Sequence, residues 1–278
     1  MSGIEHSQTL LQPSTKVDGR ANANDPAHLN AVRKELEQRV KPGDVVILNH
    51  PDHYSHLHSG IQWRWRAHVL EIAHWTFVSL PDHIVYPSHA LQAEISKPGW
   101  VIPHGIDLQF KSADVERDSF LFFAGRLTRD KGLDIASEAA QLAGVELVLA
   151  GPRPDQSFAA ELLSRSHVKY VGELSYAELL EYYERAAAVV YMTQYTEPFG
   201  LTAIEAMAMG CPVIATGLGG TGETIVDGLT GYYCQTADEI AAIIPRLSSL
   251  AEEAIVAHAR RYTRERMASD YLALFAGL

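Results

Sequence analysis

Short runs of apolar residues alternate with longer stretches of helical spacing along most of the chain. In the first third, apolar runs predict buried strands at 45–48, 68–74, 82–88 and 100–102. From Asp118 onward, strands are expected near 119–124, 145–150, 168–171, 188–192 and 212–216, and helices near 131–143, 156–165, 175–187, 198–209 and 220–227. Such regular alternation predicts an α/β protein with a doubly wound parallel sheet.

The two ends of the chain show other patterns. Residues 1–25 are polar and lack periodicity, so we expect a flexible arm there. A helix is expected over 25–40, where Asp25-Pro26 supplies a start, and a second helix from Ser88. The last part of the chain predicts helices at about 236–248 and 252–276.

Composition narrows the class of protein. The 278 residues are 47% hydrophobic and carry a net charge of −11, which disfavours nucleic acid and anionic membranes as broad electrostatic partners. Cys211 and Cys234 are too few for a disulfide framework, which suits a reducing cytoplasm. The first residues do not have the pattern of a signal peptide, and no apolar run approaches the roughly 18 residues of a membrane span. We therefore expect a cytoplasmic protein with no transmembrane segment.

The stretch Glu197-Pro198-Phe199-Gly200-Leu201-Thr202-Ala203-Ile204-Glu205 carries the most chemical information. Pro198 suits the first turn of a helix and Gly210 suits its end, so a helix is expected over 198–209, directly after the apolar run 188–192. The free N–H groups at such a helix start bind phosphate or another anion. Glu205 lies two turns further on, on about the same side, where its carboxylate can accept hydroxyl hydrogens.

Five segments in order resemble one enzyme family. They are Val101-Ile102-Pro103-His104-Gly105-Ile106-Asp107, Phe122-Phe123-Ala124-Gly125-Arg126-Leu127 with Lys131-Gly132, the pair of glutamates at 197 and 205, Gly219-Gly220-x2-Glu223, and Asp227-Gly228-x2-Gly231. Together they resemble the family 4 retaining glycosyltransferases of the GT-B fold. In the first segment the family has Asn at the position of His104.

This resemblance implies two Rossmann-like lobes with the site in the cleft between them. It implies a reduced N-terminal acceptor-side lobe over 1–107, a C-terminal nucleotide-sugar-binding lobe over 108–260, and a final helix over 261–278 that packs back toward the first lobe. The substrates would be a nucleoside diphosphate sugar and an acceptor hydroxyl, with no cofactor and no metal. Family members have a longer first lobe with a glycine-rich loop, so a homo-oligomer, a partner chain or a non-catalytic nucleotide-sugar-binding subunit stays open.

Two cations are expected to hold the donor diphosphate. Arg126 follows a strand and Lys131 stands at the next helix start, so both reach a pyrophosphate from one side, Arg126 as a planar fork and Lys131 as a point charge. The alternative is a pair of solvated surface cations. The resemblance implies that His74, at the end of a first-lobe strand, faces the donor sugar, although a lone histidine is more often structural.

The resemblance assigns the other donor contacts. Glu205 would bind the ribose hydroxyls, and Glu197 with the N–H of Phe199 would contact the sugar. The remaining donor-binding residues would be Gly125, Leu174 beside the base, and the helix start Gly200, Leu201 and Thr202. Glu205 has an alternative, purely structural role, because Thr202-x-x-Glu205 also fits a capping box that would stabilise the helix by about 1 kcal/mol.

Three other patterns have competing interpretations. The histidines of 50–58 suggest a metal site, but a polar loop is favoured because no cysteine joins them. The segment 62–66 places arginines beside tryptophans, either for an anionic ligand or as ordinary packing. Gly217-x-Gly219-x-x-Gly222 fits a dinucleotide fingerprint, but too little chain follows for a second half-sheet, so an oxidoreductase is disfavoured.

Overall fold

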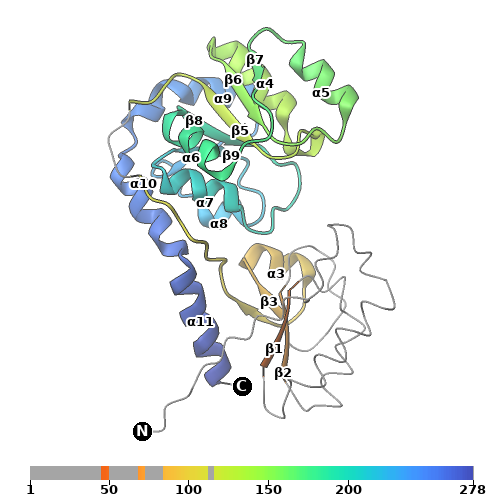
Figure 1. The fold of residues 1–278 in the computed structure, drawn as a ribbon, viewed down its shortest axis with the longest axis vertical. Helices are drawn as coiled ribbons and strands as arrows, with labels where there is room; N and C mark the ends of the chain where they lie inside the picture. Colours follow the sequence, from red (N-terminus) through yellow and green to blue (C-terminus); the bar gives the residue numbers. More distant parts are fainter. Residues whose placement is uncertain (1–44, 50–67, 73–83, 112–115, 278) are drawn as a thin grey trace.

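Two parallel sheets, one in each half of the chain, organise the computed structural model (Figure 1). The structure describes residues 45–49, 68–72, 84–111 and 116–277. We call the parts built around the two sheets the first lobe and the second lobe. Several sequence predictions lie outside the described residues, namely the arm 1–25, the helix 25–40, the segments 50–58 and 62–66, and His74.

The first sheet has the order β1-β2-β3-β4. Its strands are β1 (Val45–Asn49), β2 (His68–Ile72), β3 (Ile84–Tyr86) and β4 (Trp100–Val101), and their pairings are all parallel. The helix expected from Ser88 is α3 (His89–Ile95), with Ser88 as its N-cap. Leu91 packs with Ile84 and Tyr86, which joins this helix to the sheet.

The second sheet confirms the predicted doubly wound arrangement. Its strands are β5 (Leu121–Ala124), β6 (Leu147–Ala150), β7 (Val168–Tyr170), β8 (Ala188–Tyr191), β9 (Val213–Ala215) and β10 (Gly231–Tyr233). Their order is β10-β9-β8-β5-β6-β7, and all pairings are parallel. Chain connections leave in opposite directions from β5 and β8, so these two strands form the switch point at which such sheets bind ligands.

Strand β10 is absent from the sequence prediction. Its short Gly-Tyr-Tyr segment follows a turn-rich stretch and lacks the β-branched residues that predict a buried strand. Gly231 lets it approach β9, because a Cβ there would lie 1.8 Å from the carbonyl oxygen of Val213.

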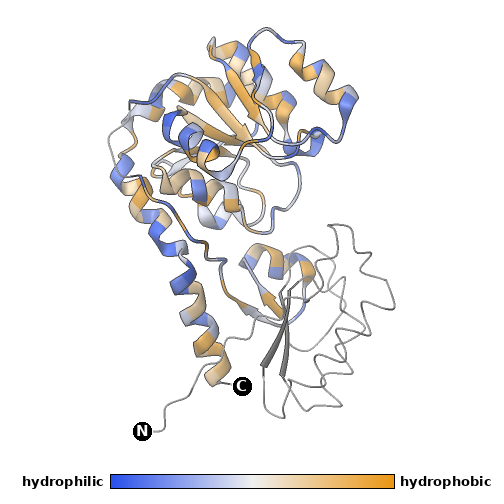
Figure 2. Cartoon of the chain, viewed as in Figure 1, coloured by the Kyte–Doolittle hydropathy of each residue, from blue (hydrophilic) through white to orange (hydrophobic). Residues whose placement is uncertain are grey.

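Helices cover both faces of the second sheet. They are α4 (Leu133–Ala143), α5 (Gln156–Leu163) and α9 (Ala237–Ile243) on one face, and α6 (Tyr176–Arg185), α7 (Leu201–Ala208) and α10 (Glu252–Ala259) on the other. Alternate residues of a strand pack against opposite helix layers. Leu121 and Phe123 pack on the face covered by α4, α5 and α9, and Phe122 packs on the face covered by α6, α7 and α10. Figure 2 shows the strands as strongly hydrophobic and the helices as mixed.

The C-terminal helix expected at 252–276 is broken into two. After α10 come the 3-10 turn η3 (Arg260–Tyr262) and then α11 (Arg264–Ala276), with Thr263 extended between them. The break exists because Thr263 pairs with Ile106 of the interlobe connection, whose carbonyl accepts a hydrogen bond from the N–H of Arg264 at 3.2 Å. No helix in the described ranges is long and apolar enough to span a membrane.

Helix α11 leaves the second lobe and lies along the first (Figure 1). Its Tyr271 packs with Val85 of β3 and with Ile102. The chain therefore passes between the lobes twice, once near Ile106 and once near Thr263, and the two passages lie side by side. Gly105 permits this approach, because a Cβ there would lie 2.2 Å from the carbonyl oxygen of Thr263.

Candidate active site at the switch point

The structure brings Lys131 and Glu197 together at the switch point of the second sheet. Lys131 ends the short turn η1 (Arg129–Lys131) after β5, and Glu197 lies in the loop after β8. The Lys131 Nζ lies 3.6 Å from Glu197 Oε2, and the two side chains are only 12% and 13% exposed. Sequence spacing alone gave no indication that these two side chains would meet.

Two tyrosines complete this cluster. The Lys131 ammonium contacts the hydroxyl of Tyr195 and lies over the rings of Tyr195 and Tyr191, 4.8 and 5.6 Å from their centroids. Burial raises the pKa of both phenols, and the negative charge of Glu197 raises these pKa values further. Both tyrosines therefore stay neutral beside the ion pair of Lys131 and Glu197. Sequence analysis missed them, although Tyr195 stands only two residues before Glu197.

Glu197 keeps an unused acceptor. Its Oε2 is buried and has no hydrogen bond of ordinary geometry to any described residue, since the ion pair with Lys131 is longer than a hydrogen bond, although the hydroxyls of Tyr191 and Tyr195 lie near this carboxylate. Buried polar atoms are nearly always paired, so an unpaired carboxylate oxygen here suits a hydroxyl donor supplied by a ligand.

The helix after Glu197 begins later than the sequence predicts. Gly200, with φ of 96°, is the N-cap of α7, and the first helical residue is Leu201 rather than Pro198. The preceding loop is held away from helical geometry, because Glu197 pairs with Gly219 and the carbonyl of Pro198 accepts the hydroxyl of Ser88. We call residues 197–200 the donor loop.

This helix start leaves backbone donors available. In the described part of the chain, the N–H groups of Leu201 and Thr202 have no acceptor, and no side chain caps the helix. The capping-box hypothesis for Thr202 and Glu205 is thus wrong, because the cap is Gly200. A free helix start carries partial positive charge and suits an anion.

Glu205 lies on α7, half-buried and beside Tyr183. Burial raises the pKa of the Glu205 carboxyl, and the nearby Tyr183 hydroxyl lowers it in part. That hydroxyl is itself buried without a hydrogen bond of ordinary geometry to any described residue. Tyr176, an exposed residue at the start of α6, lies close enough for the charge of Glu205 to raise its phenol pKa, although burial has the larger effect. Both tyrosines were missed from the sequence.

Arg126 and Gly125 lie at the end of β5. The Arg126 side chain is exposed, and its charge partly offsets the raised pKa of Tyr195. A close backbone contact adjoins it, because a Cβ on Gly151 would lie 2.1 Å from the carbonyl oxygen of Gly125. Leu174, between β7 and α6, is half-buried and packs against the core. These residues thus flank the same carboxyl edge of the sheet.

The glycine pattern after β9 serves packing. The Gly220 N–H donates to the carbonyl of Glu197 at 2.6 Å, and a Cβ on Gly219 would lie 2.3 Å from the same oxygen. The helix that follows, α8 (Thr221–Thr224), is only four residues long. The resemblance to a dinucleotide fingerprint is therefore explained by close contact with the donor loop.

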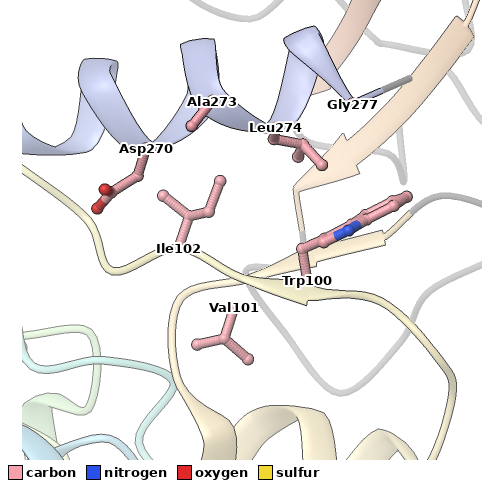
Figure 3. Close-up of a pocket in the computed structure, with 7 residues that line it drawn as sticks. All are labelled: Trp100, Val101, Ile102, Asp270, Ala273, Leu274 and Gly277. Carbon is pink, nitrogen blue, oxygen red and sulfur yellow. The ribbon is translucent and has the colours of Figure 1, made fainter.

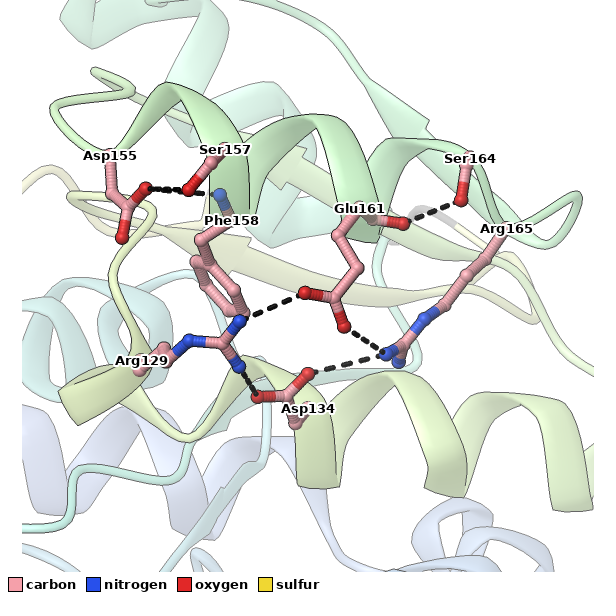
Figure 4. A network of polar contacts seen from close by, with 8 residues as sticks. All are labelled: Arg129, Asp134, Asp155, Ser157, Phe158, Glu161, Ser164 and Arg165. Carbon is pink, nitrogen blue, oxygen red and sulfur yellow. Dashed lines mark hydrogen bonds and ion pairs between the residues drawn. The ribbon is translucent and has the colours of Figure 1, made fainter.

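A surface network fastens the turn that carries Lys131 (Figure 4). Arg129 pairs with Asp134 at 3.1 Å and with Glu161 at 2.8 Å, and Arg165 pairs with Asp134 at 3.2 Å. The Arg129 guanidinium also lies over the ring of Phe158 at 4.5 Å. The network joins η1 to α4 and α5.

A separate cavity lies between β4 and α11 (Figure 3). It has a volume of about 550 Å³ and is lined by Trp100, Val101, Ile102, Asp270, Ala273, Leu274 and Gly277. None of the residues predicted for the site lines it. In the described ranges, no group of three or more histidine, cysteine, aspartate or glutamate side chains is placed to hold a metal ion.

Residues 106–266 match the family model described as glycosyl transferases group 1. Glycogen synthase of Mycobacterium tuberculosis (strain ATCC 25618 / H37Rv) is 34% identical over 161 residues, which cover 54% of this chain and 38% of that protein. D-inositol 3-phosphate glycosyltransferase of Mycolicibacterium smegmatis is 31% identical over 170 residues, covering 55% and 39%. The chain thus spans well under half the length of these relatives.

Solved structures agree on the fold. Anabaena Alr3699/HepE in complex with UDP-glucose has a TM-score of 0.76 at 18% identity, covering 90% of this chain and 82% of that chain. AviGT4, a glycosyltransferase involved in Avilamycin A biosynthesis, has a TM-score of 0.64 at 26% identity, covering 75% and 67%. These likenesses confirm the expected GT-B type of fold.

Proposed function

The chain belongs to the group 1 glycosyl transferases, and on this basis we propose that it transfers a sugar from a nucleoside diphosphate sugar to an acceptor hydroxyl. The observation that carries the proposal is the cluster at the switch point. Lys131 and Glu197 meet there beside a free helix start, and Glu197 keeps an unpaired acceptor oxygen.

The diphosphate would bind between the cations and the helix start. Lys131 and Arg126 supply positive charge, and the N–H groups of Leu201 and Thr202 supply donors. As the bond between sugar and phosphate breaks, negative charge grows on the leaving diphosphate. Groups already in place for that charge lower the barrier without reorganisation. The ammonium of Lys131 would exchange part of its contact with Tyr195 for a phosphate oxygen.

The two glutamates would take different parts of the donor. Glu205 would accept hydrogen bonds from the ribose hydroxyls, with Tyr183 behind it and with Leu174 and Tyr176 on the side of the base. Glu197 and the N–H of Phe199 would contact the sugar. We propose a retaining outcome, in which the glycosidic bond breaks on the face where the acceptor attacks. The acceptor would approach from the first lobe, where His74 is the predicted sugar-facing residue, and no metal would be needed.

Binding and turnover can be tested separately. A thermal-shift series with UDP, GDP and ADP should show stabilisation by at least one nucleotide, worth about 2.7 kcal/mol at a hundredfold excess over Kd. UDP is tried first because the similar Anabaena structure is a complex with UDP-glucose. Lys131→Ala should abolish the shift, whereas Lys169→Ala, an exposed lysine on β7, should keep it. If none of the three nucleotides shifts the melting temperature, the proposed donor site is wrong.

Release of nucleoside diphosphate from the matching nucleotide sugar then tests catalysis. Binding with turnover by the single chain supports the transferase. Binding without turnover supports the alternative from the sequence, a nucleotide-sugar-binding subunit completed by a partner chain.

A further inference from the structure

The Gly219-Gly220-x2-Glu223 motif has a contact that the proposed reaction leaves unexplained. Glu223 belongs to α8 in the second lobe, but its carboxylate reaches the start of α3 in the first lobe. Oε1 accepts the N–H of Ala90 at 2.6 Å, and Oε2 accepts the N–H of His89 at 3.1 Å. Each oxygen therefore takes one of the free donors at the helix start, and the charge suits the positive end of the helix.

A second bond crosses between the lobes beside the first. The hydroxyl of Ser88, the N-cap of α3, accepts the N–H of Leu91 at 3.1 Å and donates to the carbonyl of Pro198 at 2.7 Å. Ser88 is only 1% exposed. One helix start in the first lobe is thus bonded to two places in the second lobe, namely α8 and the donor loop.

The position of Pro198 connects this contact to the site. Pro198 stands between Glu197 and Phe199, the two residues proposed to contact the sugar. A shift of α3 away from the second lobe would remove the hydrogen bond that holds the Pro198 carbonyl. Because α3 packs on its own sheet through Leu91, it moves with the first lobe.

We propose that Ser88 and Glu223 form an interlobe clasp that holds the cleft closed and sets the donor loop in its sugar-binding conformation. They act as positioning residues. The idea deepens the proposed function and rests on it for the role of the donor loop, whereas the clasp itself is testable without any substrate. Glu223 and His89 are exposed, so their bonds can break and reform with little desolvation, as a reversible closure requires.

Glu223→Gln is the test variant, because it keeps the size of the side chain but leaves one acceptor oxygen and no charge for two N–H donors. Glu239→Gln is the matched control. Its carboxylate also accepts N–H groups at a helix start, those of Gln235 and Thr236, but within the second lobe. Both variants replace a carboxylate at a helix start by a neutral amide, and only the Glu223 contact joins the two lobes.

Amide exchange by mass spectrometry on peptides spanning 86–95 is the first readout. Glu223→Gln should speed exchange there by about tenfold or more, as loss of a charge-assisted hydrogen bond implies. It should also increase the radius of gyration in small-angle scattering. Glu239→Gln should change neither. Unchanged exchange over 86–95 in folded Glu223→Gln overturns the clasp, whether or not the chain transfers sugar.

Kinetics test the link to the donor loop. With a nucleotide sugar that supports turnover, Glu223→Gln and Ser88→Ala should both lower kcat while leaving the Kd of the bare nucleoside diphosphate within about twofold of the parent value. A weakened nucleotide with unchanged kcat would contradict the positioning role. Faster exchange with unchanged kcat would keep the clasp but refute its effect on the donor loop.

Discussion

The ring of His104 meets the ring of Phe199 edge-on, with centroids 5.1 Å apart and planes at 81°. His104 lies in the interlobe connection, and Phe199 lies in the donor loop. Tyr262 also contacts the ring of Phe199 edge-on, with centroids 5.8 Å apart and planes at 74°. The donor loop is thus held by aromatic contacts from both passages between the lobes.

We expect the contact between His104 and Phe199 to contribute about 0.5–1.5 kcal/mol beyond buried area, as aromatic pairs do. A double-mutant cycle with His104→Asn and Phe199→Leu, followed by urea unfolding, measures this coupling energy directly. Asn is the residue that the resembled family has at position 104. A coupling energy near zero would mean that the two rings are merely neighbours.

Arg126→Ala and Lys131→Ala should weaken binding of a nucleoside diphosphate and leave the bare nucleoside nearly unaffected, because in the proposed site the lost charges would contact the diphosphate and not the nucleoside. Titration calorimetry with both ligands checks this. Lys169→Ala serves again as the control for removal of one positive charge. Equal losses for nucleoside and diphosphate would show that the cations act through folding of the site instead.

Glu205→Gln and Glu197→Gln should separate binding from turnover. Loss of the proposed ribose acceptor at Glu205 should weaken nucleotide and nucleotide sugar alike, by on the order of 1.5–3 kcal/mol for hydrogen bonds to a charged group. Glu197→Gln should leave nucleotide affinity nearly intact and lower kcat, since its proposed partner is the reacting sugar. Affinity and turnover are measured side by side, with melting temperature as the folding control. Full turnover in Glu197→Gln would remove the sugar-facing role.

The raised pKa of Glu205 predicts a pH dependence. Its folded pKa lies above its unfolded value, so the folded state holds the proton more tightly. Below both pKa values the Glu205 carboxyl is protonated and does not destabilise the folded state. As the pH rises from the unfolded to the folded pKa, the folded state becomes less stable. The melting temperature of Glu205→Gln minus that of the parent should therefore be larger at pH 7 than at pH 4. Thermal unfolding of both proteins at both pH values checks the sign. A difference in melting temperature that is the same at both pH values would contradict the raised pKa.

Arg117 is expected to be a strong stability determinant. Its guanidinium donates to the carbonyls of Tyr183, Glu184, Ala186 and Met209, near the ends of α6 and α7, and pairs with Glu252 at 3.2 Å. Arg117→Met should cost about 2–4 kcal/mol, because several carbonyls lose their donor at once. The control is Arg185→Met. Arg185 is 58% exposed and pairs with Asp118, so its loss should cost under about 1 kcal/mol. Chemical unfolding of both variants gives the comparison.

Local patterns were enough to predict most elements, and contacts between distant segments explain the exceptions. The short apolar run 188–192 predicts a buried strand, and β8 (Ala188–Tyr191) confirms it with every residue buried. Thr263 lies within a stretch of helical spacing, and only its pairing with Ile106 breaks the helix. Helix α7 likewise begins at Leu201, after the N-cap Gly200, and not at the predicted Pro198. The reason is again a distant contact, since Ser88 and Gly219 hold the preceding loop.

For the candidate site, too, the sequence indicates individual residues but not the contacts between distant segments. Lys131 and Glu197 could each be selected from the sequence, because both belong to segments that resemble the glycosyltransferase family and both come after a predicted strand. The position of Tyr195 beside them depends on how the loop after β8 folds. No local spacing in the sequence predicts that conformation. The contact between Glu223 and α3 is still less local, since it joins residues 133 and 134 positions apart.

The paired passages at Ile106 and Thr263 also limit how the lobes can move. A single connecting segment would let one lobe swivel freely about its backbone bonds. Here two extended segments are hydrogen-bonded side by side, and the Cα of Gly105 lies against the carbonyl of Thr263. We expect such a paired connection to resist twisting of one lobe against the other more than a single segment would, and to leave opening and closing of the lobes as the easier relative motion.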